Sequence, residues 1–197
     1  MVLVLVALLA SGGQQLLDRT LALVSGQPIT LSDVRGAVAL GLIEGRAGDE
    51  AVAAATDRLV DRALILREVQ RYAPPMPAES AVEARLAEIR DRVGTAGWMR
   101  TLERFALTEA RLRAWVRDDI RAQAYLAQRF ASASTPTDGE VAAAYNRGRA
   151  EFERQGITFE QATPALRERL AESRRAELTA DWLADLRRRT DIVRIPQ

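Results

Sequence analysis

The sequence contains no cysteine, no histidine and no lysine, and aromatic residues make up only 5% of it. Without cysteine, disulfides, thiol nucleophiles and thiolate metal ligands are excluded. Without histidine, imidazole metal sites, Ser–His–Asp triads and imidazole acid–base catalysis are excluded as well. The absence of cysteine also fits an oxidising compartment, where an unpaired thiol is a liability. These absences favour a binding protein over an enzyme.

The charged residues are almost balanced in number. There are 28 basic residues, all of them arginine, and 27 acidic ones, so the net charge is +1. The acids interleave with the arginines, so no long basic stripe indicates nucleic acid as a partner. No glycine-rich phosphate loop, GxSxG elbow or metal-binding signature is present, and we expect no cofactor.

The chain opens with an apolar run at residues 2–10, followed by Ser11 and Gly12. Nine apolar residues are too few to span a bilayer as a helix, which takes about 20. The length and the small residues after it predict a secretory signal peptide at residues 1–12, although no basic residue precedes the run. The alternative is a buried first strand or helix. No cysteine follows, which excludes a lipoprotein anchor, and we expect no stable membrane span.

Apolar residues recur at spacings of three and four along most of the chain, which predicts a mainly α fold. Thr30, Thr108, Thr137 and Thr158 are predicted N-caps. The predicted helices lie at about 30–44, 50–71, from after Pro77 to Gly94, 98–105, 108–130, 137–152 and 158–189. A hairpin is predicted near residues 19–29 and a short strand at 192–195.

Charged pairs on these helices are predicted to be surface features. Glu88 with Arg92, and Glu109 with Arg113, lie one helical turn apart, and such pairs contribute about 0.3–0.5 kcal/mol. Asp57 and Asp61 also lie one turn apart. We interpret them as part of a solvated charged face, not as a metal or acid–base pair.

Several segments, taken in order, resemble one protein family. Residues 18–33 give a strand, a turn, Ile29-Thr30 and then a helix, and residues 59–69 and 136–145 follow in the same order. Residues 183–195 end the chain with a helix and a strand. This order is similar to that of the SurA-type and PpiC-type periplasmic folding factors.

One departure from that family is large. Typical members carry a parvulin-type prolyl isomerase domain between the hinge helix and the final helix. Here that interval runs only from about Phe152 to Phe159, whereas a folded domain takes about 50 residues or more. A residual peptidyl-prolyl isomerase is therefore the least favoured function.

The resemblance implies a multi-helix SurA-like chaperone core with a small sheet formed by the N-terminal hairpin and the C-terminal strand. It implies three parts: an N-terminal helical chaperone domain at 13–131, a hinge helix and linker at 132–158, and a C-terminal helix and strand at 159–197 that pack back on the N-terminal lobe. It also implies a periplasmic location. Two copies exchanging terminal strands would give a homodimer.

The function that the resemblance implies is ATP-independent binding of unfolded exported polypeptides, above all precursors of outer-membrane β-barrels. Trp98, Met99 and Phe105 are the candidate peptide-binding residues, because they lie in a glycine-flanked segment and combine aromatic rings with a flexible thioether. The alternative for these residues is that they fill the helical core. The alternative function is that of a dedicated assembly or scaffold subunit for one envelope protein.

Overall fold

The computed structural model describes residues 18–45 and 49–196, and the predicted signal peptide lies outside them. Most of these residues are helical, which confirms the mainly α prediction. The elements follow in this order: β1 (Thr20–Val24), β2 (Gln27–Thr30), α1 (Leu31–Ala39), α2 (Asp49–Tyr72), α3 (Glu79–Val93), α4 (Thr95–Arg104), α5 (Glu109–Arg129), α6 (Ala131–Ser134), α7 (Asp138–Arg147), α8 (Arg149–Gln155), α9 (Phe159–Arg189) and β3 (Ile192–Arg194).

The two ends of the described chain meet in one small sheet of order β2-β1-β3. β1 pairs antiparallel with β2, and its other edge pairs antiparallel with β3, with Leu23 opposite Val193. The predicted sheet of hairpin and C-terminal strand is confirmed. Pairing satisfies the backbone groups of β1 on both edges, which a lone strand would leave open.

Four of the predicted helix starts are confirmed by their threonine caps, whereas the helix predicted from residue 98 begins at Thr95. Thr30, Thr137 and Thr158 each form a capping box with the residue three positions on, and the Thr108 hydroxyl accepts from the backbone N–H of Arg111. Each cap satisfies N–H groups that the first helical turn leaves free.

Helix ends differ from the prediction in two places. α1 stops at Ala39 and not near residue 44, because Gly41 takes a positive φ of 62° and Arg92 donates to its carbonyl oxygen at 3.1 Å. A Cβ on Gly41 would collide with that guanidinium. The helix predicted at 137–152 is broken at Gly148 into α7 and α8. In addition, the predicted linker after residue 131 contains the short helix α6.

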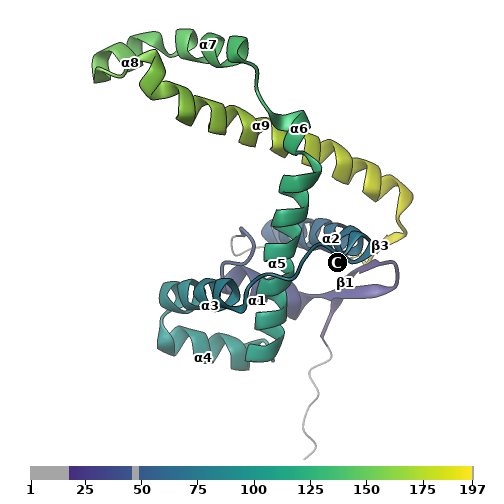
Figure 1. The fold of residues 1–197 in the computed structure, drawn as a ribbon. Coiled ribbons are helices and arrows are strands. Elements are labelled where there is room, and N and C mark those ends of the chain that lie inside the picture. Colours follow the sequence, from purple (N-terminus) through teal and green to yellow (C-terminus); the bar gives the residue numbers. More distant parts are fainter. Residues whose placement is uncertain (1–17, 46–48, 197) are drawn as a thin grey trace, which may run out of the picture.

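Two hydrophobic cores make up the body of the molecule, which comprises the sheet, α1 to α5 and the C-terminal part of α9 (Figure 1). The first core joins the sheet, α1, α2, α5 and α9, and it includes Val60, Tyr125 and Trp182. The second joins α3, α4 and α5 around Ile89 and Val116. Helix α5 therefore contributes to both cores from different sides.

An arm projects from this body and consists of α7, α8 and the N-terminal half of α9 (Figure 1). It has its own small core of Val141, Ala144, Ala162 and Leu166. The Tyr145 ring stacks on Phe152 and its hydroxyl donates to the Ile157 carbonyl at 3.1 Å. From the arm, α9 runs back past α6 to the sheet.

Ion pairs help to hold the C-terminal segment on α2. Arg187 donates to Asp61 at 2.7 Å, and Arg194 lies 2.5 Å from Asp57. The interpretation of these two aspartates as part of a solvated charged face is incomplete: their side chains are partly exposed, and each is paired with an arginine more than a hundred residues away. The alternation of acids and arginines on α2 could not show which distant side chains would reach them.

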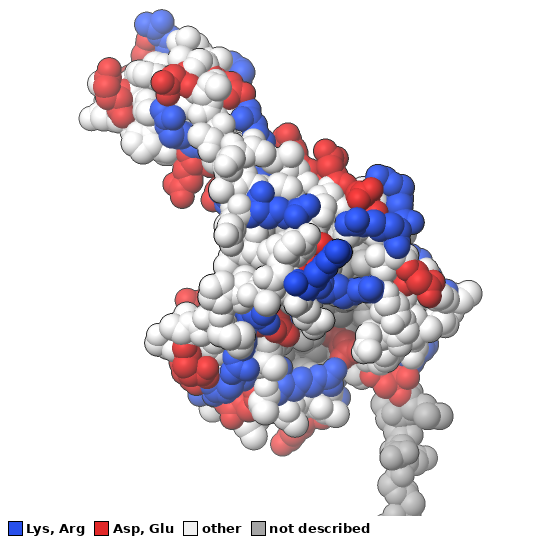
Figure 2. Space-filling view, turned by 45° about the vertical axis from the view of Figure 1, so that its right-hand side comes forward, with Lys and Arg blue, Asp and Glu red and all other residues white. Residues whose placement is uncertain are grey.

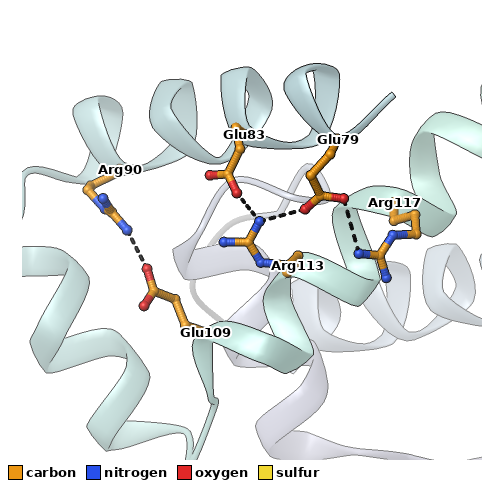
Figure 3. Close-up of polar contacts among 6 residues, drawn as sticks. All are labelled: Glu79, Glu83, Arg90, Glu109, Arg113 and Arg117. Atoms are coloured by element: carbon orange, nitrogen blue, oxygen red, sulfur yellow. Dashed lines mark hydrogen bonds and ion pairs between the residues drawn. The ribbon is translucent and has the colours of Figure 1, made fainter. Parts of the chain in front are cut away.

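Helices α3 and α5 are linked by arginine–glutamate contacts, which Figure 3 shows. Arg113 contacts both Glu83 and Glu79, and its distance to Glu79 is 2.9 Å. Arg117 lies 3.5 Å from Glu79, and Arg90 pairs with Glu109. The predicted pairing of Glu109 with Arg113 is wrong, and Glu88 pairs with Arg85, not Arg92. Tertiary neighbours replace the expected partners within one helix.

Candidate functional site

The three predicted peptide-binding residues do not form one exposed patch. Trp98 is only 4% exposed; it packs in the second core, and Arg90 lies over its ring at 5.0 Å. Met99 is 54% exposed, and Phe105 is half-buried close to Gly36. For Trp98 the structure favours the alternative, a core residue. Neighbours on a helix point about 100° apart, so Trp98 and Met99 cannot share one face.

A different surface combines exposed aromatic rings with a concavity. Tyr72, Pro74, Tyr125, Gln128 and Arg129 line a depression of about 380 Å³ where the end of α2 meets the end of α5. We call these five residues the junction groove. Tyr72 is 57% exposed, so much of its ring faces solvent.

The sequence around Tyr72 explains its position. Ala73 adopts a positive φ of 44°, and Pro74 follows at once, so α2 ends at Tyr72. Proline has no N–H to donate and disfavours a helical conformation in the residue before it. Two further prolines flank Met76, which is 61% exposed. The helix end thus presents a tyrosine, prolines and a methionine to solvent.

The aromatic rings of the groove wall pack against further aromatic rings inside the protein. The rings of Tyr72 and Tyr125 stack with centroids 5.8 Å apart, and Tyr125 lies 6.1 Å from Trp182 on α9. Trp182 in turn meets Phe130 edge-on at 6.1 Å. Aromatic pairs of this kind contribute about 0.5–1.5 kcal/mol beyond burial. The wall formed by Tyr125 is therefore anchored, while Tyr72 presents its ring to solvent.

Arg129 supplies the charge of the groove. Its guanidinium donates to the Tyr125 hydroxyl at 3.3 Å and lies over the ring of Trp182 at 4.8 Å. Burial raises the pKa of Tyr125 above its usual range, and the charge of Arg129 offsets part of that rise. The phenol therefore stays protonated at neutral pH. The groove offers aromatic surface, a cation and a hydroxyl.

A second depression, also about 380 Å³, lies between α3 and α5. Its lining mixes apolar and polar side chains: Leu42, Ala81, Ala84, Arg85, Glu88, Val116, Asp119, Ile120 and Gln123. Asp119 accepts from Arg62 at 2.7 Å, and Arg85 pairs with Glu88. Burial raises the pKa of Asp119, and Arg62 offsets part of that rise. The charges of this α3–α5 groove are matched within the protein.

Other kinds of site find little support in the part of the chain that the structure describes. Within residues 18–45 and 49–196, no group of three or more carboxylates is arranged to hold a metal ion. Within the same residues, no helix is long and apolar enough to cross a membrane. Figure 2 shows basic and acidic side chains interspersed over body and arm, with basic ones gathered near the middle of that face.

Comparisons with known proteins do not assign the chain to a family. Neither a scan of protein-family models nor a search of curated proteins returns a match. The resemblance to SurA-type folding factors therefore stays a proposal, and the junction groove must be interpreted from its own chemistry.

The sequence prediction missed the junction groove because its walls come from α2 and α5, far apart in the chain. One signal was available in the sequence. Only Ala73 separates Tyr72 from a proline-rich segment, which predicts that the helix ends there. A ring in the last turn of a helix has no further helical turn to cover it. What the sequence could not supply is the stacking partner, Tyr125.

Proposed function

We propose that this protein is an ATP-independent chaperone that binds unfolded exported polypeptides in the periplasm, with precursors of outer-membrane β-barrels as its main clients. The observation that carries this proposal is the junction groove. Tyr72 lines this concavity and is more than half exposed, and no described segment of this chain fills the concavity. Met76, four residues further along the chain, is also more than half exposed. Exposed apolar surface of this kind is typical of a binding site.

The chemistry of the groove suits segments of varied sequence. Aromatic faces adapt to many apolar side chains, and the ring of Pro74 exposes apolar surface without needing a backbone partner. The proposed function is binding without a chemical step. The pairing of hairpin and C-terminal strand supports the SurA-like reading of the fold, and that resemblance is the basis for the periplasmic location.

The test is suppression of aggregation. An outer-membrane barrel protein unfolded in urea is diluted into buffer without nucleotide, and light scattering is followed with increasing amounts of the protein. We expect a dose-dependent fall in scattering, and no binding to a folded soluble enzyme. Scattering that is unchanged by the protein would reject the chaperone function.

Two matched variants locate the binding surface. Tyr72→Ala removes the exposed ring of the groove, whereas Met99→Ala removes a similarly exposed apolar side chain on α4. We expect the first to weaken suppression several-fold and the second to leave it unchanged. Equal losses in both variants would mean that the client binds non-specifically to exposed apolar side chains and not to the groove.

The second candidate function is a scaffold for one envelope protein, and the edge of β3 favours it. Val193 and Ile195 are 44% and 38% exposed, and β3 is paired only through β1 among the described strands. An exposed strand edge can take up one further strand from a partner through main-chain hydrogen bonds. A single tight folded partner, with no suppression of aggregation, would favour this function.

A further inference from the structure

The junction groove carries a positive charge that forms no ion pair among the described residues. Its five lining residues include one arginine and no acid. Among the described residues, Arg129 has no carboxylate within ion-pair distance, and neither does Arg71, which lies over the Tyr72 ring at 5.9 Å. Glu68, one turn before Tyr72 on α2, is the acid whose charge acts on Tyr125. By contrast, Arg62 and Arg187 elsewhere in the body are each paired with an aspartate.

Packing against rings fixes the position of Arg129 and leaves its charge available. Its guanidinium lies 4.8 Å from the Trp182 ring and 5.5 Å from the Phe130 ring. Cation–π packing restricts the side chain and removes water from one of its faces, yet leaves its remaining N–H groups free to donate. A guanidinium held in this way is suited to bind a carboxylate.

A second donor converges on the same point. The Tyr125 hydroxyl accepts a hydrogen bond from Arg129, so its own hydrogen is directed elsewhere. The Gln128 amide lines the same concavity and adds a further donor. Aromatic surface for a ring therefore lies beside donors for an anion.

We propose that the junction groove selects unfolded segments in which an aspartate or glutamate lies next to an aromatic residue. The aromatic side chain of the segment packs against Tyr72 and Pro74, and its acid binds Arg129 and the Tyr125 hydroxyl. This assignment rests on the proposed function, since it names the class of polypeptide that the same groove takes.

The direct test compares peptides on the unaltered protein. Capped, fluorescein-labelled peptides of one length, without tryptophan, carry an internal Phe-Asp, Phe-Asn or Phe-Lys pair in otherwise identical sequences, and binding is followed by fluorescence anisotropy. We expect Phe-Asp to bind about fivefold more tightly than Phe-Asn at low salt, with Phe-Lys weakest. The advantage of Phe-Asp should shrink as salt is raised, because the pair is solvent-accessible.

Variants assign the preference to one residue. Arg129→Gln should abolish the difference between Phe-Asp and Phe-Asn, and Arg129→Lys should keep most of it. Arg100→Gln is the matched control, because Arg100 lies on α4 and donates only to a backbone carbonyl within its own helix. Circular dichroism shows whether each variant is folded, and the peptide series on the unaltered protein stands even if an Arg129 variant is not.

Each other outcome has a defined meaning. Equal affinity for Phe-Asp and Phe-Asn overturns this inference while leaving polypeptide binding intact. No binding of any peptide, together with no suppression of aggregation, rejects the proposed function as well. An uncapped peptide that ends in phenylalanine is added to the series; if it binds while the capped Phe-Asp peptide does not, the assignment to internal acidic segments is overturned.

Discussion

Helix α5 has two sides that differ in whether their charged side chains are paired within the protein. On the side facing α3, Val116 packs in the second core and the arginines are paired with glutamates of α3 (Figure 3). On the opposite side, Tyr125 and Arg129 support an exposed ring and a guanidinium without a carboxylate partner among the described residues. Val116 and Tyr125 are nine residues apart, which at 3.6 residues per turn places them on opposite sides of the helix.

We interpret this difference as one between a structural surface and a proposed binding surface. Both sides have a depression of about 380 Å³, so volume alone does not distinguish them. What distinguishes them is whether the charged side chains of the lining form ion pairs within the protein. The charges around the α3–α5 groove are paired within the protein, which a role in stability explains. For the exposed Tyr72 and the charge of Arg129 we propose a role in binding a polypeptide.

The largest effect is expected on the side facing α3. Ile89 is fully buried there, and Ile89→Ala should lower the free energy of unfolding by about 2–5 kcal/mol, because it leaves a cavity in the small second core. Urea unfolding followed by circular dichroism measures this loss. Under conditions where the variant is folded, its polypeptide binding should equal that of the unaltered protein. A selective loss of binding would show that the side of α5 facing α3 also takes part in binding.

A smaller effect is expected from removing the last strand. A stop after Arg189 deletes β3 and with it the pairing to β1 and the contact of Arg194 with Asp57. We expect a loss of about 1–3 kcal/mol, from a few backbone hydrogen bonds and one ion pair. The melting temperature should therefore fall. An unchanged melting temperature would show that the sheet does not need its C-terminal strand.

Asp119 should make stability depend on pH in a particular direction. Burial raises its pKa in the folded protein above the ordinary value of 3.8, so the folded state holds this proton more tightly than the unfolded state. Its contribution to stability is therefore greatest below pH 3.8 and is lost as the pH rises through the raised pKa. Asp119→Asn should remove this component from a pH series of urea unfolding curves. An identical pH dependence in protein and variant would contradict the assignment.

The smallest effect is expected from the exposed ion pairs between α3 and α5. Glu83→Gln should change the free energy of unfolding by less than about 1 kcal/mol, because Arg113 keeps Glu79 as a partner and solvent screens the pair. Unfolding in low and high salt provides the check. A loss of several kcal/mol would mean that these charges, and not the second core, hold α3 in place.

Local signals in the sequence predicted much of the fold. The threonine caps and the glycines that end helices act within a few residues, so Thr137 and Thr158 marked helix starts correctly. Contacts between distant segments were not accessible in this way. Asp61 meets Arg187 across the molecule, and nothing near Asp61 in the chain indicates that partner.

The candidate site shows the same limit more sharply. Trp98 and Met99 are adjacent in the sequence, and their type alone could not show that one is buried and the other exposed. Tyr72, Tyr125 and Trp182 come from three helices, and only tertiary packing brings their rings together. The residue types in the sequence predicted where the apolar helices lie, but they could not show which side of α5 remains exposed.

The most direct test of the central claim uses two glutamines on opposite sides of α5. Gln128 lines the junction groove and Gln123 lines the α3–α5 groove, and both are exposed. A photo-reactive amino acid replaces each in turn, and the protein is irradiated with a labelled unfolded barrel precursor. We predict strong crosslinks from position 128 and few from position 123. Equal crosslinking, or a preference for position 123, would contradict binding at the junction groove.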